Sequence, residues 1–161
     1  MNRADSAITL RTLAEQDCAV FARVIRGHRL FEPYRLTPAR LAGQLTEALK
    51  LGHGLIGAEA AGQPAGLAWY LTGGTFGHCG YLRLMVVASG QTGRGIGTLL
   101  MQEVEGRVFA VSSDLFLLVN VPNAAAQAFY EAKGYVRVGR LDDFAQPGQH
   151  EYIYRKRRQS P

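Results

Sequence analysis

The stretch QTGRGIGTLL occupies residues 91–100 and decides the fold. It follows a nearly continuous apolar run at residues 81–87, as expected for a strand that is covered on both faces. The apolar residues that follow recur at helical spacing, which predicts a helix directly after the loop. The loop itself is rich in glycine, with Gly93, Gly95 and Gly97 at alternate positions. The sequence therefore predicts a glycine-rich connection between a buried strand and a helix N-terminus.

A loop of this kind suits a phosphate group. Glycines let a ligand approach the backbone, and the first turn of a helix offers N–H groups and a partial positive charge. Arg94 can add a charge-assisted contact. The loop lacks the Gly-Lys-Ser or Gly-Lys-Thr of a Walker motif, and no acidic residue ends the next strand as a dinucleotide fingerprint requires. The alternative is a structural turn that happens to be rich in glycine.

The N-terminal part of the chain is predicted to form a strand followed by two helices. The strand spans residues 8–11, and Thr12 then caps the first helix in a capping box with Glu15. That helix is predicted to carry its apolar side chains on one side: Val20, Phe21, Val24 and Ile25. Thr37 caps the second helix. Its predicted buried stripe consists of Leu41, Leu45 and Leu49.

The rest of the chain is predicted to be mainly strands. Glycine-rich turns are expected at residues 62–64 and 73–74. A helix at residues 123–133 precedes the last two strands. The predicted strands lie at residues 54–60, 65–72, 81–87, 115–119, 135–140 and 151–155. The element order β-α-α-β-β-β-α-β-α-β-β indicates an α/β domain, in which a mixed sheet has helices on both faces.

Composition narrows the functional classes. The chain has 161 residues, enough for one domain (1–161) with a core that needs no metal or disulfide. Cys18 and Cys79 are expected to be reduced thiols, and no metal site is predicted. Without a secretory signal or a membrane-spanning run, the expected location is cytoplasmic. Part of the net charge of +5 lies in a basic C-terminal tail (155–161), which is expected to be solvated. No nucleic-acid or membrane partner is expected.

A second motif, NAAAQAFYEAKGY, occupies residues 123–135. Read together with the glycine loop, it resembles the GNAT superfamily of acetyl-CoA-dependent N-acyltransferases. The family's loop pattern, (Arg/Gln)-x-x-Gly-x-(Gly/Ala), is matched from Thr92 to Gly97, although Thr92 stands where arginine or glutamine is usual. The later pattern, Asn-x-x-Ala-x-x-(apolar)-Tyr-(Glu)-x-x-Gly-(Phe/Tyr), is matched in full. The resemblance implies the acyl-CoA N-acyltransferase fold, a mostly antiparallel sheet of about seven strands with helices on both faces.

The resemblance also implies acetyl-CoA as co-substrate and a set of site residues. The loop would bind its pyrophosphate mainly through backbone N–H groups of the following residues: Thr92, Gly93, Arg94, Gly95, Ile96, Gly97 and Thr98. The strand before the loop would hold the pantetheine arm and polarise the thioester carbonyl through main-chain groups of Met85, Val86 and Val87.

Four residues of the second motif are implied contacts of the co-substrate. Tyr130 matches the family tyrosine that gives a proton to the departing CoA sulfur; the alternative is an aromatic side chain packed in the core. Phe129, beside it, is expected to supply that packing. Asn123 lies near the pantetheine arm in the family, but it could equally be only an N-cap. Lys133 could reach a CoA phosphate or interact with the C-terminal end of its own helix.

The acceptor and the general base stay open. Short segments resemble the diamine N-acetyltransferase branch, in which acidic residues follow a Tyr-Leu pair. Here Arg83 follows Tyr81 and Leu82, and its charge would repel a polyamine and favour an amine that carries a carboxylate or phosphate. The expected substrate contacts are Glu32, Tyr81 and Arg83. The base is expected among Glu32, Glu59, His78 or a water. A small-molecule N-acetyltransferase that forms a homodimer is expected, with a protein lysine or N-terminal acetyltransferase as the alternative.

Overall fold

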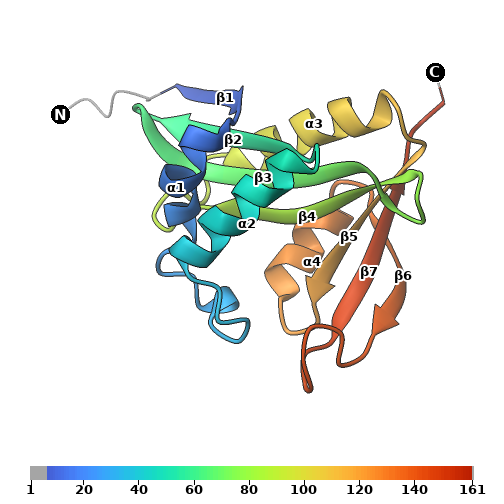
Figure 1. Cartoon of the computed structure of the whole chain (residues 1–161). Coiled ribbons are helices and arrows are strands. Elements are labelled where there is room, and N and C mark those ends of the chain that lie inside the picture. Colours follow the sequence, from blue (N-terminus) through green and yellow to red (C-terminus); the bar gives the residue numbers. More distant parts are fainter. Residues whose placement is uncertain (1–6, 161) are drawn as a thin grey trace. The chain divides into compact units, whose positions relative to one another are not determined.

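The computed structural model describes residues 7–160 (Figure 1). Its seven strands form one sheet in the order β1-β2-β3-β4-β5-β7-β6. The strands are β1 (Ile8–Thr12), β2 (Gly54–Ala60), β3 (Gln63–Thr75), β4 (Cys79–Val87), β5 (Asp114–Asn120), β6 (Val136–Leu141) and β7 (Glu151–Arg157). The helices are α1 (Cys18–Phe21), α2 (Pro38–Lys50), α3 (Ile96–Phe109) and α4 (Ala124–Glu131). The pair β4–β5 is parallel, and β1–β2, β2–β3, β5–β7 and β6–β7 are antiparallel. The predicted mixed, mostly antiparallel α/β fold is confirmed.

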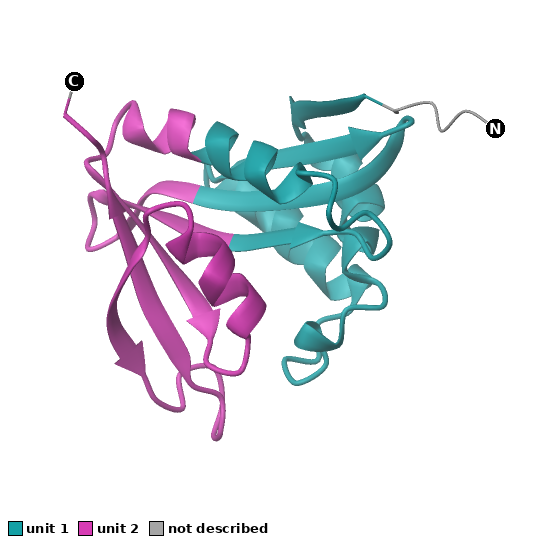
Figure 2. Ribbon diagram, turned by 180° about the vertical axis from the view of Figure 1, so that it is seen from behind, with its two compact units in different colours: residues 1–70, 84–104 teal, residues 71–83, 105–161 magenta. Residues whose placement is uncertain are grey.

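The chain divides into two compact units, coloured separately in Figure 2. The first unit comprises residues 1–70 and 84–104, of which the structure describes those from residue 7 onward. The second unit comprises residues 71–83 and 105–161. Strands β3 and β4 and helix α3 each contribute residues to both units.

In the first unit, helices lie against both faces of the sheet. Ala58 of β2 pairs with Gly66 of β3, so these two residues face the same way and Gly57 faces the other way. A Cβ added at Gly57 would lie 2.3 Å from Cε1 of Phe21 in α1. One added at Gly66 would lie 2.9 Å from Cγ2 of Ile96 in α3. Glycine at these positions therefore lets α1 and α3 pack closely on opposite faces.

The predicted start of the first helix is wrong. β1 extends through Thr12, and the first helical turn is a 3₁₀ turn, η1 (Glu15–Asp17), that follows Ala14. Asp17 accepts the backbone N–H of Ala14 at 2.8 Å, the role predicted for Glu15. The capping position moves because Thr12 is paired with Ile56 in the sheet.

Two predicted core positions also differ. Val20 is 42% exposed, because the helix is only one turn long before it tightens into the 3₁₀ segment η2 (Ala22–Ile25). In α2, Thr37 Oγ1 accepts the Arg40 N–H as predicted. Leu41 and Leu45 of the predicted stripe are fully buried, but Ala48 takes the third place and Leu49 is half-buried. The buried positions 41, 45 and 48 follow the i, i+4, i+7 spacing of an amphipathic helix, and position 49 lies at the side of this stripe.

The predicted turn at residues 73–74 is also wrong, because β3 continues to Thr75. A Cβ added at Gly74 would lie 2.8 Å from the Leu71 Cβ, so this glycine relieves crowding inside the strand. The turn lies at Phe76 and Gly77, which have φ angles of +52° and +77°.

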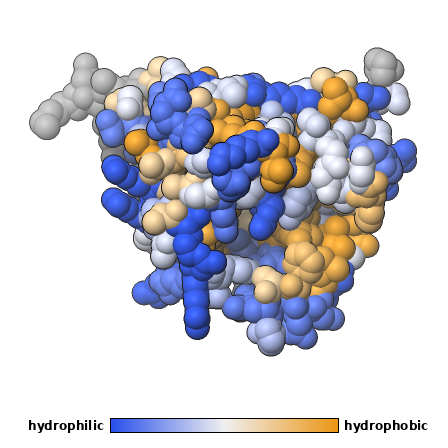
Figure 3. Space-filling view, viewed as in Figure 1, coloured by the Kyte–Doolittle hydropathy of each residue, from blue (hydrophilic) through white to orange (hydrophobic). Residues whose placement is uncertain are grey.

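In the second unit, both helical segments cover the same face of the sheet. Tyr154 and Lys156 lie two residues apart in β7 and therefore share a face. The Tyr154 hydroxyl donates to Glu131 in α4 at 2.8 Å, and Lys156 Nζ donates to Glu105 in α3 at 2.8 Å. Within the described part of this unit, no helix lies on the opposite face, which we call the open face. Figure 3 shows hydrophobic side chains gathered over β6 and β7.

The prediction of a solvated basic tail is correct only in part: Arg155 and Lys156 are half-buried, whereas residues 157–160 are exposed. β7 extends to Arg157, so most of the run is paired in the sheet. Arg155 Nη2 lies 2.6 Å from Asp114 Oδ1, and the side chain of this aspartate is only 9% exposed. Arg158 Nη1 donates to the carbonyl of Phe109 at 2.8 Å. These arginines are held because a buried carboxylate and a helix C-terminus need cationic partners.

Cys18 and Cys79 are both buried and form no disulfide, as expected. Across residues 7–160, the helices are all too short or too polar to cross a lipid bilayer.

Candidate functional site

The glycine loop joins β4 to α3 within the first unit. Gly93 and Gly95 both have φ of +77°, a conformation that residues with a Cβ rarely adopt. No atom of the described chain lies within 4 Å of a Cβ built on either glycine. The backbone conformation therefore requires glycine here, and the space above the loop is open to a ligand.

The loop presents the N-terminus of α3. The Gly95 carbonyl accepts the Leu99 N–H at 3.0 Å, so Gly95 is the N-cap of this 14-residue helix. Ile96 and Gly97 supply first-turn N–H groups that have no acceptor within the helix, and Thr98 follows in the same turn. The helix dipole adds a partial positive charge. This arrangement fits the pyrophosphate of a coenzyme A.

Side chains of the loop hold it together. Arg94 Nη1 donates to Gln91 Oε1 at 2.5 Å. Gln91 also donates its backbone N–H to the Ala88 carbonyl at 3.0 Å. The residue that departs from the family pattern, Thr92, is exposed. Gln91, one place before Thr92, therefore stabilises the loop through its hydrogen bonds. Threonine in place of arginine or glutamine at position 92 removes no contact within the loop.

The end of β4 is anchored in the first unit. Val86 is 6% exposed, whereas Met85 and Val87 are half-buried. The Ala88 N–H donates to the Ala65 carbonyl of β3 at 2.8 Å. The main chain is therefore fixed at the point where the strand passes into the glycine loop.

Sequence reasoning missed His28, which follows a segment that contacts the start of this loop. A Cβ added at Gly27 would lie 3.7 Å from the Ser89 Cβ, so the segment after η2 contacts the start of the loop. The next residue, His28, has a buried Nε2 without a hydrogen-bond partner, the one such side-chain nitrogen or oxygen found in the described structure. Buried polar atoms are nearly always paired, so this nitrogen of His28 is an exception in the described structure. A single histidine in a loop gives no sequence signal.

In the second unit, the later motif builds α4 and its ends. Asn123 Oδ1 accepts a first-turn backbone N–H at 3.1 Å, so this residue is an N-cap. Gly134 has φ of +84° and donates its N–H to the Glu131 carbonyl at 3.0 Å. Tyr135 donates its N–H to the Tyr130 carbonyl at 3.1 Å, which completes a Schellman motif. The asparagine and glycine of the motif therefore set the limits of the helix.

Tyr130 is buried in α4, with 7% of its surface exposed. Its ring packs edge-on against Phe129 and Tyr135, with centroids 5.1 and 5.6 Å away. Burial raises the pKa of Tyr130 far above its ordinary value, so the phenol stays protonated. Its hydroxyl forms no hydrogen bond with any other residue in the described range.

The expectation that Phe129 supplies the core packing is wrong. Phe129 is half-buried, and Lys133 Nζ lies 4.1 Å from the centroid of its ring. Tyr130 occupies the core position instead, because the helix turns the neighbouring side chain by about 100°. Lys133 thus has a cation–π contact on the surface of α4.

The expected substrate residues fall in different units. Tyr81 and Arg83 lie two residues apart in β4 and share the open face of the second unit. Burial raises the pKa of Tyr81, and the guanidinium of Arg83 beside its hydroxyl opposes this rise. Arg83 therefore does not point away from Tyr81. Glu32 is exposed in the first unit, directly after the 3₁₀ turn η3 (Arg29–Phe31).

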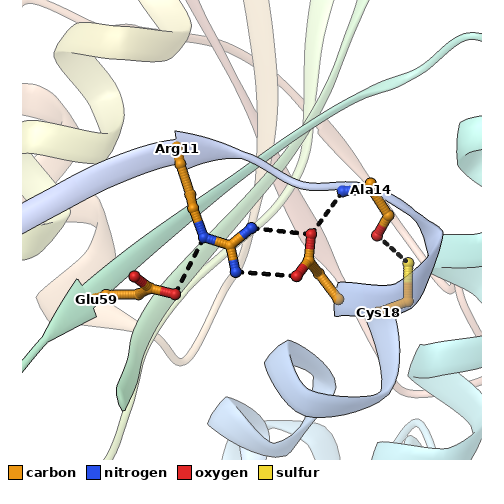
Figure 4. Close-up of polar contacts among 5 residues, drawn as sticks. Arg11, Ala14, Cys18 and Glu59 are labelled. Atoms are coloured by element: carbon orange, nitrogen blue, oxygen red, sulfur yellow. Dashed lines mark hydrogen bonds and ion pairs between the residues drawn. The ribbon is translucent and has the colours of Figure 1, made fainter. Parts of the chain in front are cut away.

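Two of the candidate bases have structural partners. Figure 4 shows Glu59 accepting Arg11 Nε at 3.1 Å, while the same guanidinium makes two bonds of 2.9 Å to Asp17. His78 Nδ1 donates to the Phe76 carbonyl at 2.9 Å, within the β3–β4 turn. Glu59 thus belongs to the β1–β2 edge, and His78 holds a turn.

Comparison with known families decides the assignment. The model of the acetyltransferase (GNAT) family matches residues 21–135, which is more than half of the chain and includes both motifs. The chain belongs to the GNAT acetyltransferase family. This GNAT chain is therefore an acetyltransferase, with acetyl-CoA as its co-substrate.

Solved structures support the fold of this GNAT acetyltransferase. A GNAT-family protein from Desulfovibrio desulfuricans has a TM-score of 0.80 and 24% identity, covering 94% of this chain and 99% of that one. Ribosomal-protein-alanine N-acetyltransferase from Brucella melitensis has a TM-score of 0.73 and 22% identity, covering 92% and 99%. YncA from Salmonella typhimurium, solved with acetyl-CoA, has a TM-score of 0.72 and 15% identity, covering 94% of both chains. No curated protein matches the sequence.

Proposed function

We propose that this GNAT acetyltransferase moves the acetyl group of acetyl-CoA onto the primary amine of a small molecule that carries an anionic group. The amine attacks the thioester directly in a ternary complex. The observation that carries the proposal is the glycine loop of residues 92–98, whose positive φ angles and open surface present the first turn of α3. The family matched by residues 21–135 supports the same reading.

The proposed contacts of acetyl-CoA come from both motifs. Backbone N–H groups of residues 92–98 bind the pyrophosphate, with Arg94 as an added cation. Main-chain groups of residues 85–87 hold the pantetheine arm and polarise the thioester carbonyl. From the second motif, Asn123, Phe129, Tyr130 and Lys133 complete the contacts.

Tyr130 is the proposed general acid. Acetyl transfer leaves a thiolate on coenzyme A, which needs a proton. A phenol whose pKa is raised by burial stays protonated at neutral pH and above. Its hydroxyl has no competing hydrogen bond among the described residues, which leaves the proton available for the sulfur.

Arg83 is the residue proposed to select acceptors by their charge. Its guanidinium lies beside the Tyr81 hydroxyl on the open face. A fixed cation there disfavours a polyamine and favours a carboxylate or phosphate, which a guanidinium binds in a fork. We therefore propose an acceptor site that departs from the diamine branch. Glu32 is the further proposed acceptor contact.

An acceptor screen that follows the release of free CoA tests this function. The panel contains polyamines, amino acids and aminoglycosides, together with a lysine peptide and an N-terminal peptide. We expect turnover of carboxylated amines and little turnover of spermidine. Tyr130→Phe serves as the control for enzyme-dependent release. Robust spermidine turnover without any preference for carboxylated amines would refute the proposed acceptor, and exclusive turnover of peptides would favour a protein acetyltransferase. We further propose that the chain forms a single domain and assembles as a homodimer. Truncated variants that fail to fold would support the single domain, and light scattering would measure the oligomeric state.

A further inference from the structure

Sequence reasoning left the general base open, and the open face of the second unit carries a buried carboxylate that nothing above uses. Glu151, the first residue of β7, is only 7% exposed. Burying a carboxylate is costly unless it is paired or hydrogen-bonded, so the position of Glu151 calls for an explanation.

The strand register gives Glu151 its place. It pairs with Asn120, the last residue of β5. Arg155 lies four residues after Glu151 in β7, so both face the same way. Arg155 pairs with Phe116 of β5, and Phe116 is also the partner of Tyr81 in β4. Paired residues share a face, so Glu151 lies on the same face as Tyr81 and opposite α3 and α4.

The pKa of Tyr81 depends on the charged groups around its hydroxyl. Burial raises the pKa of its phenol, Arg83 lowers that pKa by its charge and hydrogen bond, and the negative charge of Glu151 raises it. Arg83 and Glu151 are therefore both within electrostatic range of one hydroxyl. The face thus presents a cation and an anion together, which matches the carboxylate and ammonium of an amino acid.

The end of β5 also leads directly to the proposed acid. Only two residues separate Asn120, the partner of Glu151, from Asn123, which caps the helix α4 that carries Tyr130. The carboxylate and the phenol therefore belong to neighbouring elements of one unit. Asn120 is itself held by Gln149, whose Oε1 accepts its side-chain N–H at 3.1 Å.

We propose that Glu151 is the general base, binding the acceptor's ammonium group and taking a proton from it, while Arg83 binds the acceptor's anionic group. This inference rests on the proposed function. The freed lone pair forms the C–N bond to the acetyl carbon, and the C–S bond breaks. The thiolate takes a proton from Tyr130, and the surplus proton on nitrogen returns to the tyrosinate through solvent. The proton on Glu151 leaves to solvent, so the overall reaction releases CoA, the amide and one proton.

The test uses two acceptors with the same amino-acid scaffold, whose amines differ strongly in basicity. L-Alanine is mostly an ammonium at neutral pH, whereas the amine of 3,3,3-trifluoro-L-alanine is mostly neutral. A base is needed for the first and much less for the second. Glu151→Gln should lower kcat/KM for alanine by about 100-fold or more, and for trifluoroalanine by less than about tenfold. The affinity for acetyl-CoA, measured by calorimetry, should be unchanged.

Two variants separate a base from a structural carboxylate. Asp114→Asn removes another buried carboxylate from the same face, and it should lower both rates by the same factor. Glu151→Asp keeps a carboxylate and should retain more alanine activity than Glu151→Gln. Equal losses for the two acceptors in Glu151→Gln, or no loss, would overturn the role of Glu151. A wild-type protein that binds no acetyl-CoA or acetylates no amine would instead refute the proposed function.

Discussion

The ring of Tyr130 lies edge-on against that of Tyr135, with centroids 5.6 Å apart, and the Tyr135 hydroxyl donates to Glu105 at 3.0 Å. Tyr135 is thereby fixed at both ends, by its ring and by its hydroxyl. It holds the ring of Tyr130 in place while leaving the Tyr130 hydroxyl without a partner among the described residues. One tyrosine of the motif thus positions the other.

Tyr130→Phe should lower kcat by about 100-fold or more, because the departing thiolate loses its proton donor. Acetyl-CoA affinity and the free energy of unfolding should change little, since the hydroxyl contributes no internal hydrogen bond. Because burial raises the pKa of Tyr130, its deprotonation should not reduce the wild-type rate between neutral pH and about pH 10. Steady-state kinetics measure kcat and its pH dependence, calorimetry measures the affinity for acetyl-CoA, and urea denaturation measures the free energy of unfolding.

Tyr154→Phe is the matched control. Tyr154 is fully buried in the same unit, and its hydroxyl donates to Glu131 at 2.8 Å. Its loss should destabilise the fold by about 1 kcal/mol and leave kcat near the wild-type value. A similar loss of kcat in both variants would show that Tyr130 acts through packing and not through its proton.

The motif regions could be predicted from sequence because local chemistry decides them. Gly93 and Gly95 require positive φ, and Asn123 and Gly134 set the limits of α4. Where tertiary contacts compete with a local signal, prediction failed. Thr12 carries a capping signal, but it pairs within the sheet, and Gly74 relieves crowding inside a strand instead of forming a turn.

Charged residues of the second unit were the hardest to predict. Arg155 lies in a basic run that is typical of a solvated tail, yet it pairs with buried Asp114 from a distant strand. Glu151 also has no distinctive neighbours in sequence, and only the register of β5 with β7 places it on the face of Tyr81. The pairing of distant strands decides which charged residues share a face, and a single sequence does not reveal that pairing.

Asp114→Asn should destabilise the protein by about 2 kcal/mol at pH 7, because it removes a carboxylate bound by Arg155. The Ser113 hydroxyl, and then Arg155, hold the pKa of Asp114 below its usual value. The ionised form therefore stabilises the fold above about pH 4, and this contribution is lost as pH falls through the lower, folded-state pKa. Urea denaturation of wild type and variant should show a constant difference from pH 7 to 5 that shrinks toward pH 3.

Asp142→Asn is the exposed counterpart. Arg140 Nε lies 2.6 Å from Asp142, but the side chain of this aspartate is 64% exposed. Its replacement should leave the free energy of unfolding nearly unchanged, because solvent screens an exposed ion pair. Equal effects of the two substitutions would mean that the Asp114 pair adds nothing beyond a surface contact.

Gly57→Ala should destabilise the first unit by about 1–3 kcal/mol, because the new methyl group would lie 2.3 Å from Cε1 of Phe21 and 2.6 Å from Cδ2 of Leu13. Gly43→Ala in α2, where nothing lies within 4 Å, should stabilise the protein by about 1 kcal/mol. Thermal unfolding of both variants measures the difference. A neutral Gly57→Ala would contradict the close packing of α1 on β2.

Calorimetric titration of the folded protein with acetyl-CoA tests the central claim most directly, since every proposed step needs the loop at residues 92–98 to bind the pyrophosphate. We predict saturable binding with one ligand per chain, weakened at least about tenfold by Gly95→Val, because valine strongly disfavours the φ of +77° found there. Absence of binding heat at millimolar acetyl-CoA, or equal affinity of the variant, would contradict it.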